Sequence, residues 1–288
     1  ACARASASGA GGSAAGTGGS SGTAGSSGTG GTSGAGGSSG TAGSSGTAGS
    51  GGGTGEPSTE PFSFFVASLA RLQELSGNDL GFGGDFSYGE QGAGAGLRGA
   101  DKICTAIAEL SMPGNNKTWR AFLSVTADEN GAAVNAIDRI GQGPWYDRLG
   151  RLVANDITGL QQTRPDGEVG EDLPNEDGVP NSQPDPNMDP VDNHDTLTGS
   201  DEMGMLETDD PAETCNDWTN ATGEEDVTPQ IGHSWPRDGQ TQSWIAEHEA
   251  GGCGPGVNLF GQGGPQPGDY TVGAGGGYGG FYCFSLNP

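Results

Sequence analysis

The chain has 288 residues, of which 31% are hydrophobic and 59 are glycine, and its formal net charge is −26. Its 37 acidic side chains against 11 basic ones repel phosphate backbones and anionic headgroups, which excludes nucleic acid as a partner. No apolar run reaches the ~18 residues that cross a bilayer, and no hydrophobic core of a signal peptide is present.

Residues 1–56 form an arm of low complexity. They contain no aromatic residue and no aliphatic residue larger than alanine, so this segment cannot bury enough apolar surface to offset its chain entropy. The sequence therefore predicts two parts: a Gly/Ser/Thr-rich arm over 1–56 and one folded domain over 57–288.

Glycine occupies every third position of the arm from Gly16 to Gly55. Such a period suits a collagen-like or polyglycine-like stalk that assembles homo-oligomers, but the arm has no proline before Pro57, which a collagen helix needs. The alternative is a flexible tether with an r.m.s. reach of about 5–6 Å times the square root of its length. Both interpretations stay open at this stage.

Cys2 stands alone in the arm, and five cysteines leave one unpaired after two bridges. A start of Ala1-Cys2 followed by a long Gly/Ser tether is typical of a bacterial lipoprotein at its processing site, where the thiol carries diacylglycerol. The plainer interpretation is an incidental free thiol. We expect an extracellular or outer-membrane surface location, with membrane contact only through this anchor.

The domain begins with an aromatic run that predicts a strand over 62–68, followed by a two-turn helix over 69–75 that ends at Gly77. Apolar residues at helical spacing predict a helix over 100–110, with Cys104 facing the core. Further elements are expected at 119–125 (strand), 132–140 (short helix or turn), 143–147 and 151–154 (a small strand) and 281–286 (last strand). The first and last strands must share one sheet.

A long irregular region is predicted at about 165–213, rich in proline and carboxylates and poor in large apolar residues. Calcium takes six to eight oxygen ligands, and this region offers many at short spacings. The alternative is a solvated acidic loop that binds no ion. The candidate calcium ligands are Asn175, Asp177, Asp185, Asp189, Asp192 and Asp195.

Nothing in the sequence demands catalysis. The three histidines, His194, His233 and His248, are scattered, and His248-Glu249 lacks the second histidine of a His-Glu-x-x-His zinc motif. The stretch Gly232–Pro236 resembles a nucleophile elbow but lacks its final glycine. We therefore expect a protein that is not an enzyme.

Several motifs in order resemble the C-type-lectin-like fold, and more closely the endostatin-like branch found in bacterial surface proteins, including myxobacterial lipoproteins. The resemblance covers about 62–284 and implies an α+β domain with long irregular loops. The motifs that carry it are Gly99–Cys104, Trp119–Ser124, Gly143–Tyr146, Leu152–Ala154, Thr198-Gly199, Cys215–Thr219 and Tyr282–Phe284.

The resemblance also implies two disulfides, Cys104 with Cys283 and Cys215 with Cys253. Sugar-binding members hold calcium through a Trp-Asn-Asp triplet, whereas this chain has the order Asn216-Asp217-Trp218. These three residues are the candidate ligand-binding rim, with the indole stacking on a sugar. Alternatively, Trp218 packs over the disulfide as core.

These observations lead to two hypotheses of different classes. The first is a non-catalytic extracellular binding or adhesion module for a glycan or surface polymer, tethered by the arm, with calcium as its possible cofactor. The second is a structural subunit of an extracellular stalk or fibre, assembled through the Gly-x-y arm.

Overall fold

The computed structural model describes residues 60–287 apart from 186, 188–189, 238–240 and 260–267. The glycine-rich arm, Cys2 and the candidate ligand Asp189 lie outside these residues. The remaining domain has the α+β architecture that the sequence predicts.

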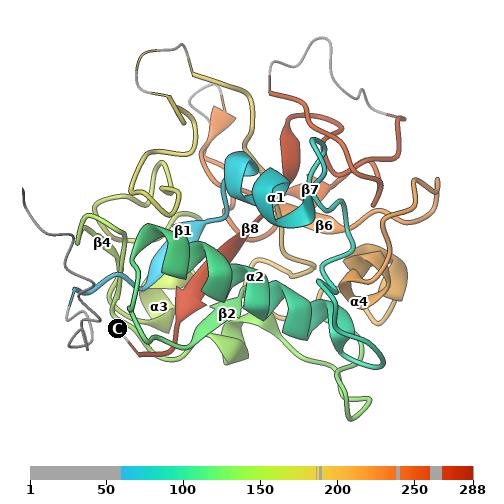
Figure 1. Ribbon diagram of the computed structural model, residues 1–288, viewed down its shortest axis with the longest axis horizontal. Helices are drawn as coiled ribbons and strands as arrows, with labels where there is room; N and C mark the ends of the chain where they lie inside the picture. Colours follow the sequence, from blue (N-terminus) through green and yellow to red (C-terminus); the bar gives the residue numbers. More distant parts are fainter. Residues whose placement is uncertain (1–59, 186, 188–189, 238–240, 260–267, 288) are drawn as a thin grey trace, which may run out of the picture. The chain divides into compact units, whose positions relative to one another are not determined.

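Strand β8 (Gly277–Ser285) is the centre of the main sheet (Figure 1). Its C-terminal half pairs antiparallel with β1 (Phe64–Val66) and β2 (Trp119–Ala121), and its beginning pairs parallel with β5 (Asp195–Leu197). β6 (Gln230–His233) and then β7 (His248–Glu249) continue from β5 to the sheet edge. The first and last strands of the domain are thus neighbours, as expected.

The two longer helices begin and end for local reasons. Helix α1 (Leu69–Ser76) is capped by the Ser68 hydroxyl and ends at Gly77, whose φ of 66° is left-handed. Helix α2 (Ala95–Ser111) begins five residues before its predicted start and packs along the sheet through Ile103, Cys104 and Ile107. The shorter elements are η1 (Ala136–Arg139), β3 (Trp145–Tyr146), β4 (Leu152–Ala154), α3 (Ile157–Leu160), η2 (Pro211–Thr214) and α4 (Cys215–Trp218).

Two hydrophobic clusters cover the two faces of β8. Phe281 and Cys283 point into the cluster under α2, and Tyr282 and Phe284 point into the other, because side chains alternate along a strand. The second cluster contains Trp244, which packs on Tyr282 with ring centroids 5.0 Å apart. A strand buried on both faces explains why the C-terminal segment is so aromatic.

Both expected disulfides are present. Cys104–Cys283 joins α2 to β8, and Cys215–Cys253 closes a second loop. Their sequence separations of 179 and 38 residues correspond to about 5 and about 4 kcal/mol of stabilisation in the chain-entropy model. These bridges add to the packing of the two hydrophobic clusters.

The predicted irregular region contains one strand, β5, within its described residues. Buried Arg164 anchors the region's beginning: its guanidinium donates to the carbonyls of Gly170 and Glu171 and to those of His233 and Ser234 at the end of β6. Polar contacts of this kind add to the few apolar side chains by which the region joins the core, Val169, Leu173 and Leu197, and they hold the end of β6 in place.

Candidate metal centre

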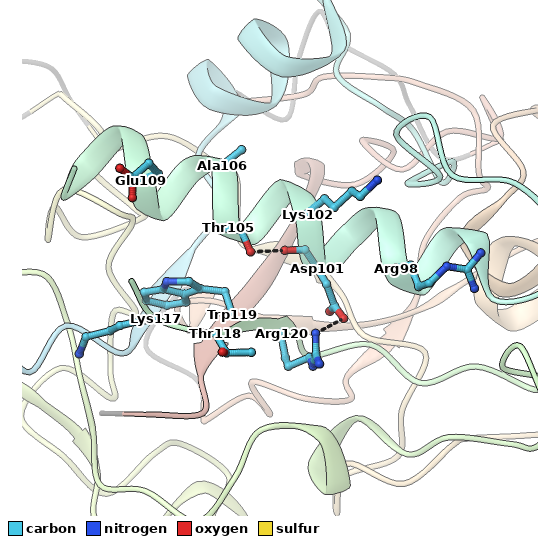
Figure 2. Close-up of a pocket in the computed structure, with 10 residues that line it drawn as sticks. All are labelled: Arg98, Asp101, Lys102, Thr105, Ala106, Glu109, Lys117, Thr118, Trp119 and Arg120. Atoms are coloured by element: carbon cyan, nitrogen blue, oxygen red, sulfur yellow. Dashed lines mark hydrogen bonds and ion pairs between the residues drawn. The ribbon is translucent and has the colours of Figure 1, made fainter. Parts of the chain in front are cut away.

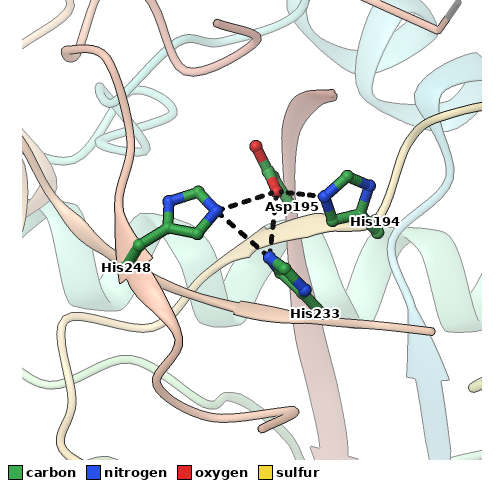
Figure 3. A group of neighbouring side chains, drawn as sticks. All are labelled: His194, Asp195, His233 and His248. Carbon is green, nitrogen blue, oxygen red and sulfur yellow. Dashed lines mark hydrogen bonds and ion pairs between the residues drawn. The ribbon is translucent and has the colours of Figure 1, made fainter. Parts of the chain in front are cut away.

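Four side chains from three neighbouring strands converge at one corner of the sheet (Figure 3). Asp195 is the first residue of β5 and lies directly opposite His233, the last residue of β6. His248 begins β7 opposite Ile231, two residues before His233, so both histidines project from the same face. His194 immediately precedes β5. We call these four residues the His/Asp cluster.

The cluster has the dimensions of a metal-ligand set. Asp195 Oδ1 lies 3.1 Å from His194 Nε2, 3.4 Å from His233 Nε2 and 3.8 Å from His248 Nε2, and the last two nitrogens are 3.2 Å apart. Tetrahedral bonds of about 2.0–2.1 Å would place ligand atoms about 3.3–3.4 Å apart. The separations from Asp195 Oδ1 to the three Nε2 atoms are thus close to those within a tetrahedral ligand set.

Burial leaves polar atoms of the cluster without partners. His194, Asp195 and His233 are buried, whereas the His248 side chain is 46% exposed. Neither carboxylate oxygen of Asp195 accepts a hydrogen bond from any residue that the structure describes. An unsatisfied buried carboxylate is costly, and a bound cation would offset that cost.

Two of the three imidazoles, those of His194 and His248, have an oxygen beside Nδ1 while Nε2 faces Asp195. Asp192 Oδ1 lies 2.7 Å from His194 Nδ1, and the Glu249 carbonyl lies 2.9 Å from His248 Nδ1. An acceptor beside Nδ1 favours a proton there and leaves the lone pair on Nε2, the arrangement typical of metal-ligating histidines. Arg237 Nη1 lies 3.2 Å from Asp192 Oδ2.

The buried environment favours the neutral imidazoles that metals bind. Burial, with the charges of Arg237 and His248, lowers the pKa of His194 to about 4. Burial, with His194, lowers the pKa of His233 to about 3. Burial, with Asp192, raises the pKa of the Asp195 carboxyl well above its usual range. Both histidines are thus held in the state that coordinates a metal.

The glycines before β8 allow the chain to pass close to the cluster. A Cβ on Gly276 would lie 3.0 Å from Asp192 Oδ1 and from His194 Cε1, and the φ of this residue is +138°. A Cβ on Gly275 would lie 3.3 Å from Asp195 Oδ2. Part of the glycine-rich C-terminal sequence therefore has a specific role beside the cluster.

The ligand set fits zinc or a neighbouring transition metal. Three imidazoles with one carboxylate provide nitrogen-rich, four-coordinate ligation, whereas calcium requires six to eight oxygens. The cluster is the only group of three or more His, Cys, Asp or Glu side chains at ligand spacing within the described residues. It also contains every histidine of the chain.

The candidate calcium ligands are placed differently from the prediction. Asp195 belongs to the cluster and Asp192 contacts it, but Asn175 Oδ1 accepts from the amides of Asp177 and Val179 in a turn. Asp177 is exposed, and Asp185 accepts from the Asn187 amide. Of the five candidates that the structure describes, it therefore brings Asp192 and Asp195 together, and it does so around imidazoles.

The candidate rim at α4 needs correction for Trp218. Its indole is fully buried and donates from Nε1 to the Ser124 carbonyl at 2.8 Å, so it has no face for a sugar. Asp217 Oδ1 accepts from the Thr126 amide at 2.6 Å, and Asn216 is exposed. Cys215 to Trp218 all have left-handed φ, between 48° and 60°. The core interpretation of Trp218 is therefore the correct one.

The pocket between α2 and β2 is a less convincing site, although it measures about 610 Å³ (Figure 2). Its central carboxylate, Asp101, pairs with Arg120 at 3.0 Å and with Arg139 at 2.8 Å. Asp101 is thus neutralised by two guanidinium groups, and no unsatisfied buried atom lies among the lining residues of the pocket.

The fold and the site define a disulfide-bonded α+β domain with a candidate three-histidine, one-aspartate metal centre. The chain matches no family model, and no curated protein resembles it significantly in sequence. No described helix is long and apolar enough to cross a membrane. Two disulfides are typical of proteins in an oxidising, extracellular compartment.

Proposed function

We propose that this protein is an extracellular, non-catalytic binding module whose domain is held together by a zinc-type ion in the His/Asp cluster. The observation that carries the proposal is the convergence of three Nε2 atoms on Asp195 Oδ1, inside a site where that carboxylate accepts no hydrogen bond from the described residues. When bound, the ion supplies the positive charge that these lone pairs require.

The geometry favours a structural ion. Four protein ligands close a tetrahedral site, whereas catalytic zinc sites keep one position for water. The ion would join β5, β6 and β7, and β7 is a two-residue edge strand whose side chains are both exposed. It would also anchor the irregular region at His194 and at β5, which lie within that region. The centre thus complements the two disulfides.

In this proposal the arm is a tether and Cys2 attaches the domain to a bacterial outer surface, where it binds a glycan or surface polymer. The glycine period of the arm favours a second candidate, a subunit of an extracellular stalk assembled through residues 16–55. Sedimentation equilibrium of the full chain beside a fragment starting at Pro57 separates them: trimers formed by the full chain alone would support the stalk.

The metal centre is tested by counting bound metal in the purified full chain and by titrating the metal-stripped chain with Zn²⁺ and Co²⁺. We expect one ion per chain and a tetrahedral Co²⁺ absorption spectrum. His233→Ala and His248→Ala should abolish both, while Glu225→Ala, which removes an exposed carboxylate elsewhere, should change neither. A wild-type chain without stoichiometric metal, or histidine variants that keep it, would overturn the proposal.

A further inference from the structure

A second cavity lies beside the metal centre, between helix α1 and the irregular region. It measures about 500 Å³, within the about 300–1,000 Å³ that small-molecule pockets occupy. Helix α1 contributes Leu69, Arg71 and Gln73, and the irregular region contributes Glu176 and Asn193. The pocket thus combines polar hydrogen-bonding groups with an aliphatic wall.

The polar groups of this pocket suit an uncharged ligand. Glu176 accepts from the Ser68 hydroxyl at 2.5 Å and from the Ser68 amide at 3.1 Å, which leaves lone pairs of its carboxylate for further donors. Arg71 already pairs with Glu74 at 2.7 Å and lies 3.7 Å from Glu176. An anion would face Glu176, Asp177 and the negative field of the whole chain.

The pocket places a carboxylate, an amide and a guanidinium group beside a leucine side chain. This combination is complementary to a molecule that carries several hydroxyls on an aliphatic frame. Hydroxyls donate to Glu176 and accept from Arg71 or Gln73, and carbon-bound hydrogens pack on Leu69 and Leu259. A purely apolar ligand would leave these polar groups without partners, at a cost.

The inner wall of the pocket is built directly on the metal centre. Asn181 and Asn193 exchange hydrogen bonds, each amide nitrogen donating to the other's backbone carbonyl, at 3.4 and 2.7 Å. Asn193 precedes His194 in the chain. Asn181 also donates to the hydroxyl of Ser234, at 2.7 Å, and the Ser234 amide donates to the His194 carbonyl at 2.8 Å.

The floor of the pocket belongs to the same network. The fully buried Tyr278 hydroxyl donates to Asn181 Oδ1 at 3.1 Å and contacts the Ala67 carbonyl just before α1. Trp235 donates from Nε1 to Asn193 Oδ1 at 2.9 Å. Two of the four cluster ligands are therefore adjacent in the chain to residues that shape the pocket, so loss of the ion would loosen its wall.

We propose that this pocket binds a small, uncharged, hydroxyl-rich molecule, such as one or two units of a neutral saccharide, and that the metal ion raises its affinity by fixing the Asn181–Asn193 wall. The inference rests on the proposed metal centre and adds a ligand site to it. It places the ligand beside α1, away from the α4 rim.

The probes are neutral methyl glycosides and alditols, with uronic acids and amino sugars as charged counterparts, measured by saturation-transfer NMR on the zinc-loaded full chain. Ala70→Trp places an indole on the exposed rim of the pocket and should abolish binding of the neutral probes. Thr105→Trp, at an exposed position of α2, is the matched control and should bind as wild type does. Stripping zinc should weaken binding about fivefold or more.

Metal content, measured on the same samples, separates the two proposals. The saccharide site alone is overturned if the zinc-loaded chain binds no neutral probe or binds only charged probes. It is also overturned if the Ala70→Trp variant binds the neutral probes as well as wild type does. Affinity that is unchanged by zinc removal overturns the coupling. A chain that never holds zinc overturns the metal centre and, with it, the coupling, and this failure is read from the metal analysis independently of the sugars.

Discussion

Zinc should raise the thermal stability of this domain by an amount that depends on its free concentration relative to its Kd. An ion that binds only the folded chain stabilises it by about 4.1 kcal/mol when free zinc is 1,000 times its Kd. For a domain of this size, 1 kcal/mol corresponds to about 2–4 °C in Tm. We therefore expect the metal-stripped chain to melt about 8–16 °C below the zinc-saturated one.

Scanning calorimetry of the full chain with zinc, with calcium and with chelator measures this shift. His248→Ala is the most informative variant, because the His248 side chain is 46% exposed and its loss removes little core packing. The Tm of this variant should equal that of the metal-stripped wild type and should not change when zinc is added. Calcium should have little effect on either chain. An unchanged wild-type Tm on zinc removal, or a full zinc response in His248→Ala, would refute the assignment of the cluster.

Three further substitutions test other features of the structure. Gly276→Ala should weaken zinc binding about 10–100-fold by displacing His194, while Gly89→Ala, which shares a positive φ but meets nothing within 4 Å, should not; titration with a competing chelator compares them. Asn216→Val should cost about 1–2 kcal/mol in urea unfolding because a β-branched residue resists left-handed φ, and Asn216→Gly should cost nothing; equal losses would contradict this reading. Burial raises the pKa of Glu176, so its contribution to stability is full below about pH 4.5 and is lost as pH rises through the raised pKa. The stability of wild type relative to Glu176→Gln should therefore fall as pH rises from about 4.5, and a pH-independent difference would disprove the shift.

The local sequence pattern was sufficient to predict the helices and strands whose apolar residues recur at a regular spacing. The aromatic run before α1, the glycine that ends it and the apolar stripe of α2 each specify an element through contacts close in sequence, and the structure contains all three. The disulfide pairing followed from the resemblance, and the structure confirms it. The start of α2 was not predicted: the helix begins at Ala95, before its apolar stripe, and Gly96 and Gly99 let this first part lie close to neighbouring backbone carbonyls.

The candidate binding rim illustrates a limit of local reasoning. From the sequence, Trp218 between polar neighbours is compatible both with an exposed ligand-binding side chain and with a buried core side chain. In the structure, the left-handed backbone of α4 directs the Trp218 indole into the core, where it stacks on Phe86. Three consecutive non-glycine residues after Cys215 in left-handed conformation are held there by surrounding contacts that no local pattern reveals.

The sequence by itself determined the acidic, glycine-rich character of the chain, the α+β class and the main elements of the domain, because these depend on composition and short-range periodicity. Only the tertiary structure decided the site. His194, His233 and His248 are separated by 39 and 15 residues and form no motif. They meet because β5, β6 and β7 pair in one register, and register is set by burial of the whole sheet. Strand pairing thus brings three histidines that are far apart in the sequence, and one of many acidic residues, into a single candidate ligand set.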